Sequence, residues 1–109
     1  MNIYRHKGIS DAGLAYLQGV TSLEKLHLDG SCITDAGIDH LLGMKRLQEL
    51  DIDGTSVSNE GLIKLKALSR LKRVYVQNSR TTSKGVAALT KFLPQVKVEL
   101  GPRPGSYER

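Results

Sequence analysis

The sequence is poor in aromatic residues and contains a single cysteine, Cys32. Phenylalanine and tyrosine make up 5% of the 109 residues and tryptophan is absent, so a core of this protein must be aliphatic. One cysteine excludes an intrachain disulfide and any metal site built from several thiolates. We therefore interpret the protein as intracellular and place it in the cytoplasm.

The sequence also lacks a long apolar run. No stretch reaches the roughly 18 to 20 consecutive apolar residues that cross a bilayer. The opening MNIYRHKGIS lacks the apolar segment of a signal peptide, so we expect no membrane insertion. With 39% hydrophobic and 25% charged residues, the chain falls among globular proteins, and its length suits one domain.

The net charge of +5 is unevenly spread along the chain. Residues 1–54 carry eight acidic and five basic residues, whereas residues 55–109 carry three acidic and eleven basic residues. The two halves could therefore face different partners. A basic excess attracts polyanions in general, but it does not establish a nucleic-acid function.

The chain repeats itself with a period of 24 residues. Units that begin at Ile9 and Ile33 share ten identical positions, a third unit begins at Val57, and a weaker fourth begins at Thr81. Glycine recurs in register in all four units, at Gly13, Gly37, Gly61 and Gly85. A fixed period of this length indicates a repeat architecture.

Each unit has a strand half and a helix half. Leu26 and Leu28 alternate with polar neighbours, which is the period of a strand. Leu14, Leu17 and Val20 recur three residues apart, which indicates a helix. By the same patterns we expect strands around Leu26–Leu28, Leu50–Ile52 and Val74–Val76, and helices beginning near Asp11, Asp35, Asn59 and Ser83.

The helix starts carry their own signals. Ser10, Thr34 and Ser58 precede the first three expected helices and predict hydroxyl N-caps. Asp11 and Asp35 then stand in the first turn, where the helix dipole favours negative charge. A 24-residue unit of strand, turn, helix and turn leaves no room for a hairpin, so the strands must be parallel and joined by helical crossovers. About four strands in one sheet are expected.

The pattern L-x-x-L-x-L-x-G-[ST]-x-[IV]-[ST]-[DN]-x-G-[LI]-x-x-L resembles the leucine-rich repeat, in the form shared by its cysteine-containing and ribonuclease-inhibitor-like subfamilies. The resemblance implies an α/β solenoid with a short curved parallel sheet on the concave side and helices on the convex side. It implies a leucine-rich-repeat domain over residues 1–101, with about four repeats starting near 9, 33, 57 and 81, and a flexible tail over 102–109. Where the family usually has asparagine or cysteine, this chain has Ser31, Thr55 and Ser79, so we expect a buried hydroxyl ladder in place of the amide ladder.

The sequence offers little catalytic chemistry. It contains none of the glycine-rich phosphate-binding motifs and no nucleophile-elbow motif. His6, His27 and His40 fall in different repeats without the spacing of a metal site, and Cys32 is interpreted as structural or incidental. We expect no catalytic residue, no cofactor and no metal ion, and we do not expect an enzyme.

The outward strand residues are polar and are the candidate binding site. Residues one period apart should become neighbours about 4.8 Å apart on the concave face. The first expected row is Ile3, His27, Asp51, Tyr75 and Glu99. Two interpretations have equal weight here: a site for a cation or a basic peptide around the aspartates, or a solvated face with cross-strand pairs of Glu49 to Lys25 and Arg73. The candidate partner-binding residues are Lys25, His27, Asp29, Glu49, Asp51, Asp53, Arg73, Tyr75 and Gln77.

The favoured function is a non-catalytic protein-interaction scaffold that presents this concave face to a partner protein. The resemblance carries most of that hypothesis, because fold does not fix function. One alternative is the binding of a polyanion such as nucleic acid through the basic second half. Another is a structural segment of a larger repeat protein.

Two expectations follow for the ends and the aspartates. The first strand is an uncovered edge, so we expect self-association through it, or fraying of residues 1–7. Reversal of Asp51 and Asp53 to lysine is expected to weaken partner binding and leave the fold intact.

Overall fold

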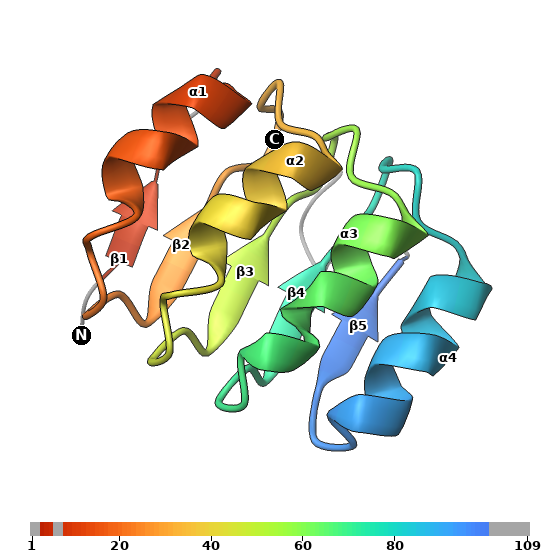
Figure 1. Cartoon of the computed structure of the whole chain (residues 1–109). Coiled ribbons are helices and arrows are strands. Elements are labelled where there is room, and N and C mark those ends of the chain that lie inside the picture. Colours follow the sequence, from red (N-terminus) through yellow and green to blue (C-terminus); the bar gives the residue numbers. More distant parts are fainter. Residues whose placement is uncertain (1–2, 6–7, 101–109) are drawn as a thin grey trace.

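The computed structural model describes residues 3–5, by their backbone alone, and residues 8–100. Five strands form one parallel sheet in the order of the sequence. They are β1 (Ile3–Arg5), β2 (Lys25–His27), β3 (Glu49–Asp51), β4 (Arg73–Tyr75) and β5 (Lys97–Glu99). The helices α1 (Asp11–Leu14), α2 (Asp35–Ile38), α3 (Asn59–Lys64) and α4 (Ser83–Phe92) lie together on one face of this sheet (Figure 1).

The fold class expected from the repeat is confirmed, with parallel strands alternating with helices. All four helices begin at the residues that the repeat pattern indicated. The first three are short and continue into 3-10 turns, η1 (Ala15–Leu17), η2 (Asp39–Leu41) and η3 (Leu65–Ala67). The sheet has five strands where about four were expected, because β1 and β5 extend it at its two ends. The domain end at residue 101 and the tail over 102–109 lie outside the described residues.

The first strand is out of step with the 24-residue period. Lys25 pairs with Glu49 and Glu49 with Arg73, as the period requires, but Ile3 pairs with Lys25 and Arg5 with His27. The expected alignment of Ile3 with His27 is therefore wrong. Arg5 lies four residues before Ile9, whereas His27 lies six before Ile33, so the first strand-to-helix turn is two residues shorter and moves the strand register by two.

The core is aliphatic and continuous from repeat to repeat. Leu26, Leu50 and Val74 are fully buried and are aligned across three neighbouring strands. The helices contribute equivalent layers, such as Leu14, Ile38 and Leu62. Because each repeat buries its apolar face against its neighbours, stability depends on stacking and not on any single helix of four to six residues.

The hydroxyl N-caps are confirmed. Ser10 Oγ accepts a hydrogen bond from the backbone N–H of Gly13, and Thr34 Oγ1 accepts one from Ala36, each at 3.3 Å. Ser58 Oγ accepts one from the third helix in the same way. Each cap satisfies a backbone donor that the helix itself leaves open.

The acidic residue after each cap also joins one repeat to the next. Asp11 Oδ1 accepts from the backbone N–H of Thr34 at 2.8 Å, and Oδ2 accepts from the Thr34 hydroxyl at 2.6 Å. Asp35 holds Ser58 by the same two bonds, and Asn59 holds Thr82 through its amide. A polar ladder therefore runs along the helix N-termini, in addition to the helix-dipole effect expected from the sequence.

The recurrent glycines make room for this ladder. A Cβ atom at any of three of them would overlap the ladder oxygen of the preceding repeat. These overlaps are Gly37 with Asp11, Gly61 with Asp35 and Gly85 with Asn59. The glycines are required by close approach between repeats, and none of the three has a positive φ.

The expected hydroxyl ladder at the strand-to-helix turns is not formed by Thr55 and Ser79, whose hydroxyls bond within their own repeats. Ser31 and Thr55 are buried, as expected. The Thr55 hydroxyl, however, donates to the carbonyl of Ile52 at 2.7 Å, and the Ser79 hydroxyl donates to that of Val76 at 2.6 Å. Both bonds close a turn within their own repeat and do not link it to the next repeat.

Candidate functional site

The concave sheet face carries two parallel rows of polar side chains. Register places Lys25, Glu49, Arg73 and Lys97 in the row where the strands begin. It places His27, Asp51, Tyr75 and Glu99 in the row where they end. From the second strand onward the expected row of His27, Asp51, Tyr75 and Glu99 is therefore confirmed.

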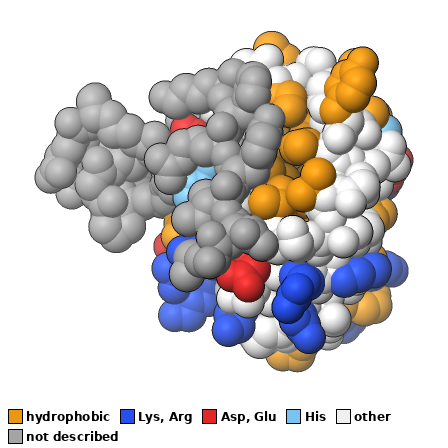
Figure 2. Space-filling view, turned by 90° about the vertical axis from the view of Figure 1, so that its left-hand side faces the viewer, with side chains coloured by type: hydrophobic (Ala, Val, Ile, Leu, Met, Phe, Trp, Pro, Cys, Tyr) orange, Lys and Arg blue, Asp and Glu red, His pale blue; other side chains and the backbone are white. Residues whose placement is uncertain are grey.

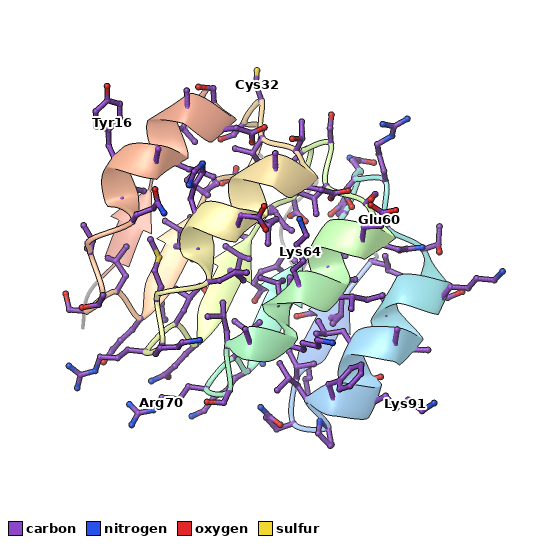
Figure 3. All side chains as sticks on the ribbon, in the orientation of Figure 1. Tyr16, Cys32, Glu60, Lys64, Arg70 and Lys91 are labelled. Carbon is purple, nitrogen blue, oxygen red and sulfur yellow. The ribbon has the colours of Figure 1, made fainter. Side chains whose placement is uncertain are left out.

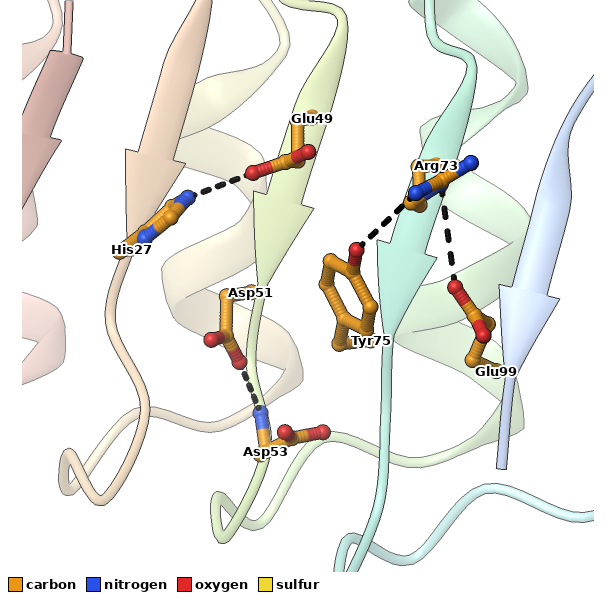
Figure 4. Close-up of polar contacts among 7 residues, drawn as sticks. All are labelled: His27, Glu49, Asp51, Asp53, Arg73, Tyr75 and Glu99. Carbon is orange, nitrogen blue, oxygen red and sulfur yellow. Dashed lines mark hydrogen bonds and ion pairs between the residues drawn. The ribbon is translucent and has the colours of Figure 1, made fainter. Parts of the chain in front are cut away.

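Glu49 and Arg73 are bound to partners other than those expected. Glu49 Oε2 lies 2.7 Å from His27 Nε2, diagonally across β2 and β3 (Figure 4). Arg73 lies 3.8 Å from the Glu99 carboxylate and donates to the Tyr75 hydroxyl at 3.4 Å. Within the described part of the chain, Glu49 forms no ion pair with Lys25 or Arg73, so those two cross-strand pairs are wrong. The hydrogen bond to Tyr75 raises the pKa of Arg73 above its ordinary value, with smaller Coulombic contributions from Glu99 and Glu49.

Asp51 and Asp53 are buried, and their carboxylates accept hydrogen bonds from backbone N–H groups. Their exposed fractions are 1% and 9%. Asp51 Oδ1 accepts from the backbone N–H of Asp53 at 3.1 Å, and Asp53 Oδ1 accepts from the backbone N–H of Gln77 at 2.7 Å. The second bond crosses from one repeat to the next. The expectation that reversing both aspartates leaves the fold intact is therefore inconsistent with their structural bonds.

The remaining candidate residues differ in accessibility. Arg73 is exposed, and Tyr75 is buried at 8% exposure. The half-buried candidates are Lys25, His27, Asp29, Glu49 and Gln77. Arg73, in the row where the strands begin, is therefore the most accessible of the candidate side chains.

Basic side chains gather at the edge where the strands begin. Residues 66–73 run from η3 into the start of β4 and include four basic residues and no acidic residue. Figure 2, which views the molecule from the side of β1 and α1, shows Lys and Arg side chains along this lower edge. Arg70 lies there, Lys91 lies on α4 on the helical side of the sheet, and Cys32 and Glu60 lie at the opposite edge (Figure 3). We call the exposed cations of this margin the basic edge; they are Lys45, Arg46, Arg70, Lys72, Arg73 and Lys97.

Two other lysines of the basic half are engaged on the helical side. Lys64 lies 3.0 Å from Asp39 of η2. The Lys66 ammonium lies 4.4 Å from the centre of the Phe92 ring, a cation–π distance. These contacts join neighbouring helices and do not form part of the basic edge.

A groove of about 390 Å³ opens in the basic edge. Its walls come from the starts of β3, β4 and β5 and from the loops that precede them. The lining residues are Gln48, Glu49, Lys72, Arg73, Gln95 and Lys97. Of these, only Glu49 and Arg73 were candidates from the sequence. The basic residues within 66–73 indicated this part of the surface in the sequence. Only the structure shows that Lys72 and Arg73 lie beside Gln95 and Lys97 in one groove.

The described residues offer no metal centre. No group of three or more His, Cys, Asp or Glu side chains among them is placed to hold an ion. Cys32 is an exposed free thiol in the turn after β2. No helix in the described part of the chain is long and apolar enough to span a bilayer.

The first repeat leaves apolar side chains exposed. Tyr16 is 88% exposed and Val20 is 36% exposed, and Figure 2 shows hydrophobic atoms on this end of the molecule. The side chains of the edge strand and residues 1–2 and 6–7 lie outside the described residues. Self-association through this strand therefore stays a prediction.

Comparison with known proteins supports the fold through structure and not through sequence. No family model and no curated protein matches the sequence. In the structure of the Chaetomium Mex67:Mtr2 subunits, a chain is similar over 91% of this protein and 75% of its own length, with a TM-score of 0.67 and 14% identity. An internalin, inlF of Listeria monocytogenes str. 4b F2365, is similar over 95% of this protein, with a TM-score of 0.55 and 16% identity; this protein spans 36% of its length. These likenesses and the repeat geometry together show a leucine-rich-repeat solenoid fold.

Proposed function

We propose that this protein is a non-catalytic interaction scaffold that presents its concave sheet face to a partner protein. The observation that carries the proposal is the strand register, which aligns equivalent side chains of successive repeats into two continuous polar rows. The helices occupy the other face of the sheet (Figure 1). A rigid surface of this kind lets a partner be read by side chains that differ from repeat to repeat, which is how solenoids bind.

The polar side chains of this face have two different roles. Asp51 and Asp53 hold backbone and fix the shape of the surface. Lys25, Arg73 and Gln77 supply contacts that a partner can reach. Half-buried and exposed polar groups that are already oriented by neighbours lose little entropy on binding.

The repeat class and the compartment are further parts of the proposal. A 24-residue unit with a helix in every repeat suits the cysteine-containing or ribonuclease-inhibitor-like class. The exposed free thiol of Cys32 suits a reducing compartment, such as the cytoplasm.

Nucleic-acid binding is the competing function. The basic edge supports it, because Lys and Arg neutralise phosphates. Single-stranded nucleic acid, however, also needs aromatic platforms for its bases. Tyr75, which bonds to Arg73 of the basic edge, is 8% exposed and offers little ring surface. Phe92 is 56% exposed, but its ring lies on the helical side against Lys66.

Matched double variants test the scaffold proposal. Lys25→Ala with Gln77→Ala alters the concave face outside the groove, and Lys84→Ala with Gln18→Ala makes the same chemical change on the helical side. Proteins captured by the immobilised wild-type chain are identified, and their dissociation constants are measured by calorimetry. We expect the concave pair to weaken direct binding by about tenfold and the helical pair by less than about twofold.

The opposite dependence would contradict the scaffold proposal. If affinity follows the helical pair, the concave face is not the binding surface. If the chain captures nucleic acid alone, and binding falls steeply with salt, the polyanion function replaces it.

A further inference from the structure

The groove in the basic edge has a floor fixed by main-chain hydrogen bonds. The backbone N–H groups of Lys72 and Arg73 both donate to the carbonyl of Gln48, at 2.8 and 3.1 Å. The backbone N–H of Lys97 donates to the carbonyl of Lys72 at 2.8 Å. The backbone beneath the groove is therefore held by the same bonds that build the sheet.

The loop above the floor is also held. Gln95 Nε2 donates to the carbonyls of Ser69 and Leu71, at 3.1 and 3.2 Å. These bonds tie the chain before β5 to the loop before β4. A ligand thus meets a preformed groove, which lowers the entropic cost of binding.

The charges in the groove are unbalanced. Lys72, Arg73 and Lys97 line it together with one acid, Glu49. The Glu49 carboxylate is held by His27 at 2.7 Å. In the described part of the chain no ion pair joins Lys72 or Lys97 to an acid, so positive charge in the groove is left for an anionic ligand.

We propose that this groove binds an acidic peptide segment of the partner protein, with its carboxylates facing Lys72, Arg73 and Lys97. The inference rests on the proposed scaffold function and specifies the chemistry of the partner. It reverses the expectation from the sequence, in which the aspartates would attract a basic partner. Arg73 can grip a carboxylate with two parallel N–H donors, while the lysines act as point charges.

Two features favour a peptide over a nucleic-acid strand. Gln48 lines the groove, and its amide can both donate to and accept from a peptide main chain, whereas a phosphate backbone offers acceptors alone. Tyr75 is buried, so bases would find no stacking surface there.

The test uses two probes and a pair of charge-matched variants of the full chain. The probes are a fluorescein-labelled hexaglutamate peptide and a fluorescein-labelled ten-nucleotide poly-dT strand, followed by fluorescence anisotropy at constant salt. Lys72→Glu with Lys97→Glu reverses charge in the groove. Lys84→Glu with Lys91→Glu makes the same change in net charge on α4.

We expect the peptide to bind the wild type more tightly than poly-dT does. The groove pair should weaken peptide binding by about tenfold or more, and the α4 pair by less than about twofold. Lys72→Met with Lys97→Met should also weaken it, which covers the case in which charge reversal disturbs folding. Far-UV circular dichroism reports the fold of each variant.

Three results would overturn the proposal: no binding of the peptide to the wild type, equal weakening by the two charge-reversal pairs, or tighter binding of poly-dT. The groove variants leave Lys25 and Gln77 unchanged. If the groove variants do not weaken peptide binding, the groove proposal fails and the scaffold proposal still stands. The scaffold proposal fails only if the Lys25 and Gln77 variants do not weaken partner binding.

Discussion

Asp35 of the second repeat holds Ser58 of the third by two hydrogen bonds. Its Oδ1 accepts from the Ser58 backbone N–H at 2.7 Å, and its Oδ2 accepts from the Ser58 hydroxyl. The same hydroxyl accepts from the N–H of Glu60 and caps α3. One carboxylate therefore fixes both the start of a helix and its position against the preceding helix.

The first prediction concerns Asp35. Asp35→Ala leaves the Ser58 N–H without this acceptor, and we expect a loss of about 1–3 kcal/mol in the free energy of unfolding. Asp35→Asn should cost less, because Asn59 makes the equivalent bonds to Thr82. Urea denaturation followed by circular dichroism measures both.

Asp39→Ala is the control for this change. Asp39 is exposed and bound to Lys64, and loss of a surface pair costs less than about 1 kcal/mol. If Asp35→Ala is no more costly than Asp39→Ala, the ladder does not stabilise the stack.

The second prediction concerns Gly61. Alanine normally stabilises a helix relative to glycine by about 1 kcal/mol. At Gly61 we expect the opposite sign, a loss of about 1–3 kcal/mol, because the new Cβ would overlap Asp35 Oδ1. Gly19→Ala is the control, since a Cβ there meets nothing within 4 Å.

A double variant separates overlap from other causes. Once Gly61→Ala has displaced the carboxylate, Asp35→Ala should cost less than it does in the wild type. Strict additivity of the two unfolding free energies would argue against the overlap.

The third prediction concerns Leu50, which is fully buried in the central strand. Leu50→Ala should lower the free energy of unfolding by about 2–5 kcal/mol, because it leaves a cavity in a continuous core. Tyr16→Ala, at a side chain that is 88% exposed, should change it by less than about 0.5 kcal/mol. Equal effects of the two changes in chemical denaturation would mean that the stack is not packed as described.

The fourth prediction concerns Asp53. Asp53→Ala removes a buried acceptor of the Gln77 N–H and should cost about 1–3 kcal/mol. In a domain of about 100 residues, each kcal/mol lowers Tm by roughly 4–8 °C. Asp53→Lys should lower Tm further, because it buries a cation beside the Gln77 N–H donor that the carboxylate accepts from.

Glu60→Ala provides the matched control for Asp53, since it removes an exposed carboxylate from a helix start and should cost less than about 1 kcal/mol. A Tm of Asp53→Ala within a degree or two of the wild type would restore the earlier view that these aspartates are free for a partner.

The period of 24 residues by itself determined the class of fold, the type of each element, the four helix starts and the aliphatic core. These are local or averaged properties: alternation makes Leu26 and Leu28 point inward, and a hydroxyl before Asp35 caps a helix. Because the same pattern recurs in every repeat, an ambiguous element in one repeat can be assigned from the equivalent residues of the others. The candidate polar rows followed from the same arithmetic from β2 onward.

Only the tertiary structure decided how the polar side chains are used. By sequence, Glu49 could pair with any of three basic neighbours, but in the structure it binds His27. Asp53 could have faced a partner, but it accepts a hydrogen bond from the Gln77 backbone instead. Such choices depend on rotamers and on distances of 1 or 2 Å, which a spacing pattern does not contain. The 24-residue period also did not predict the register of β1, because a turn that is two residues shorter shifts the whole strand without changing its residues. The groove between Gln48 and Lys97 arose likewise, because it is made where three loops meet and belongs to no single repeat.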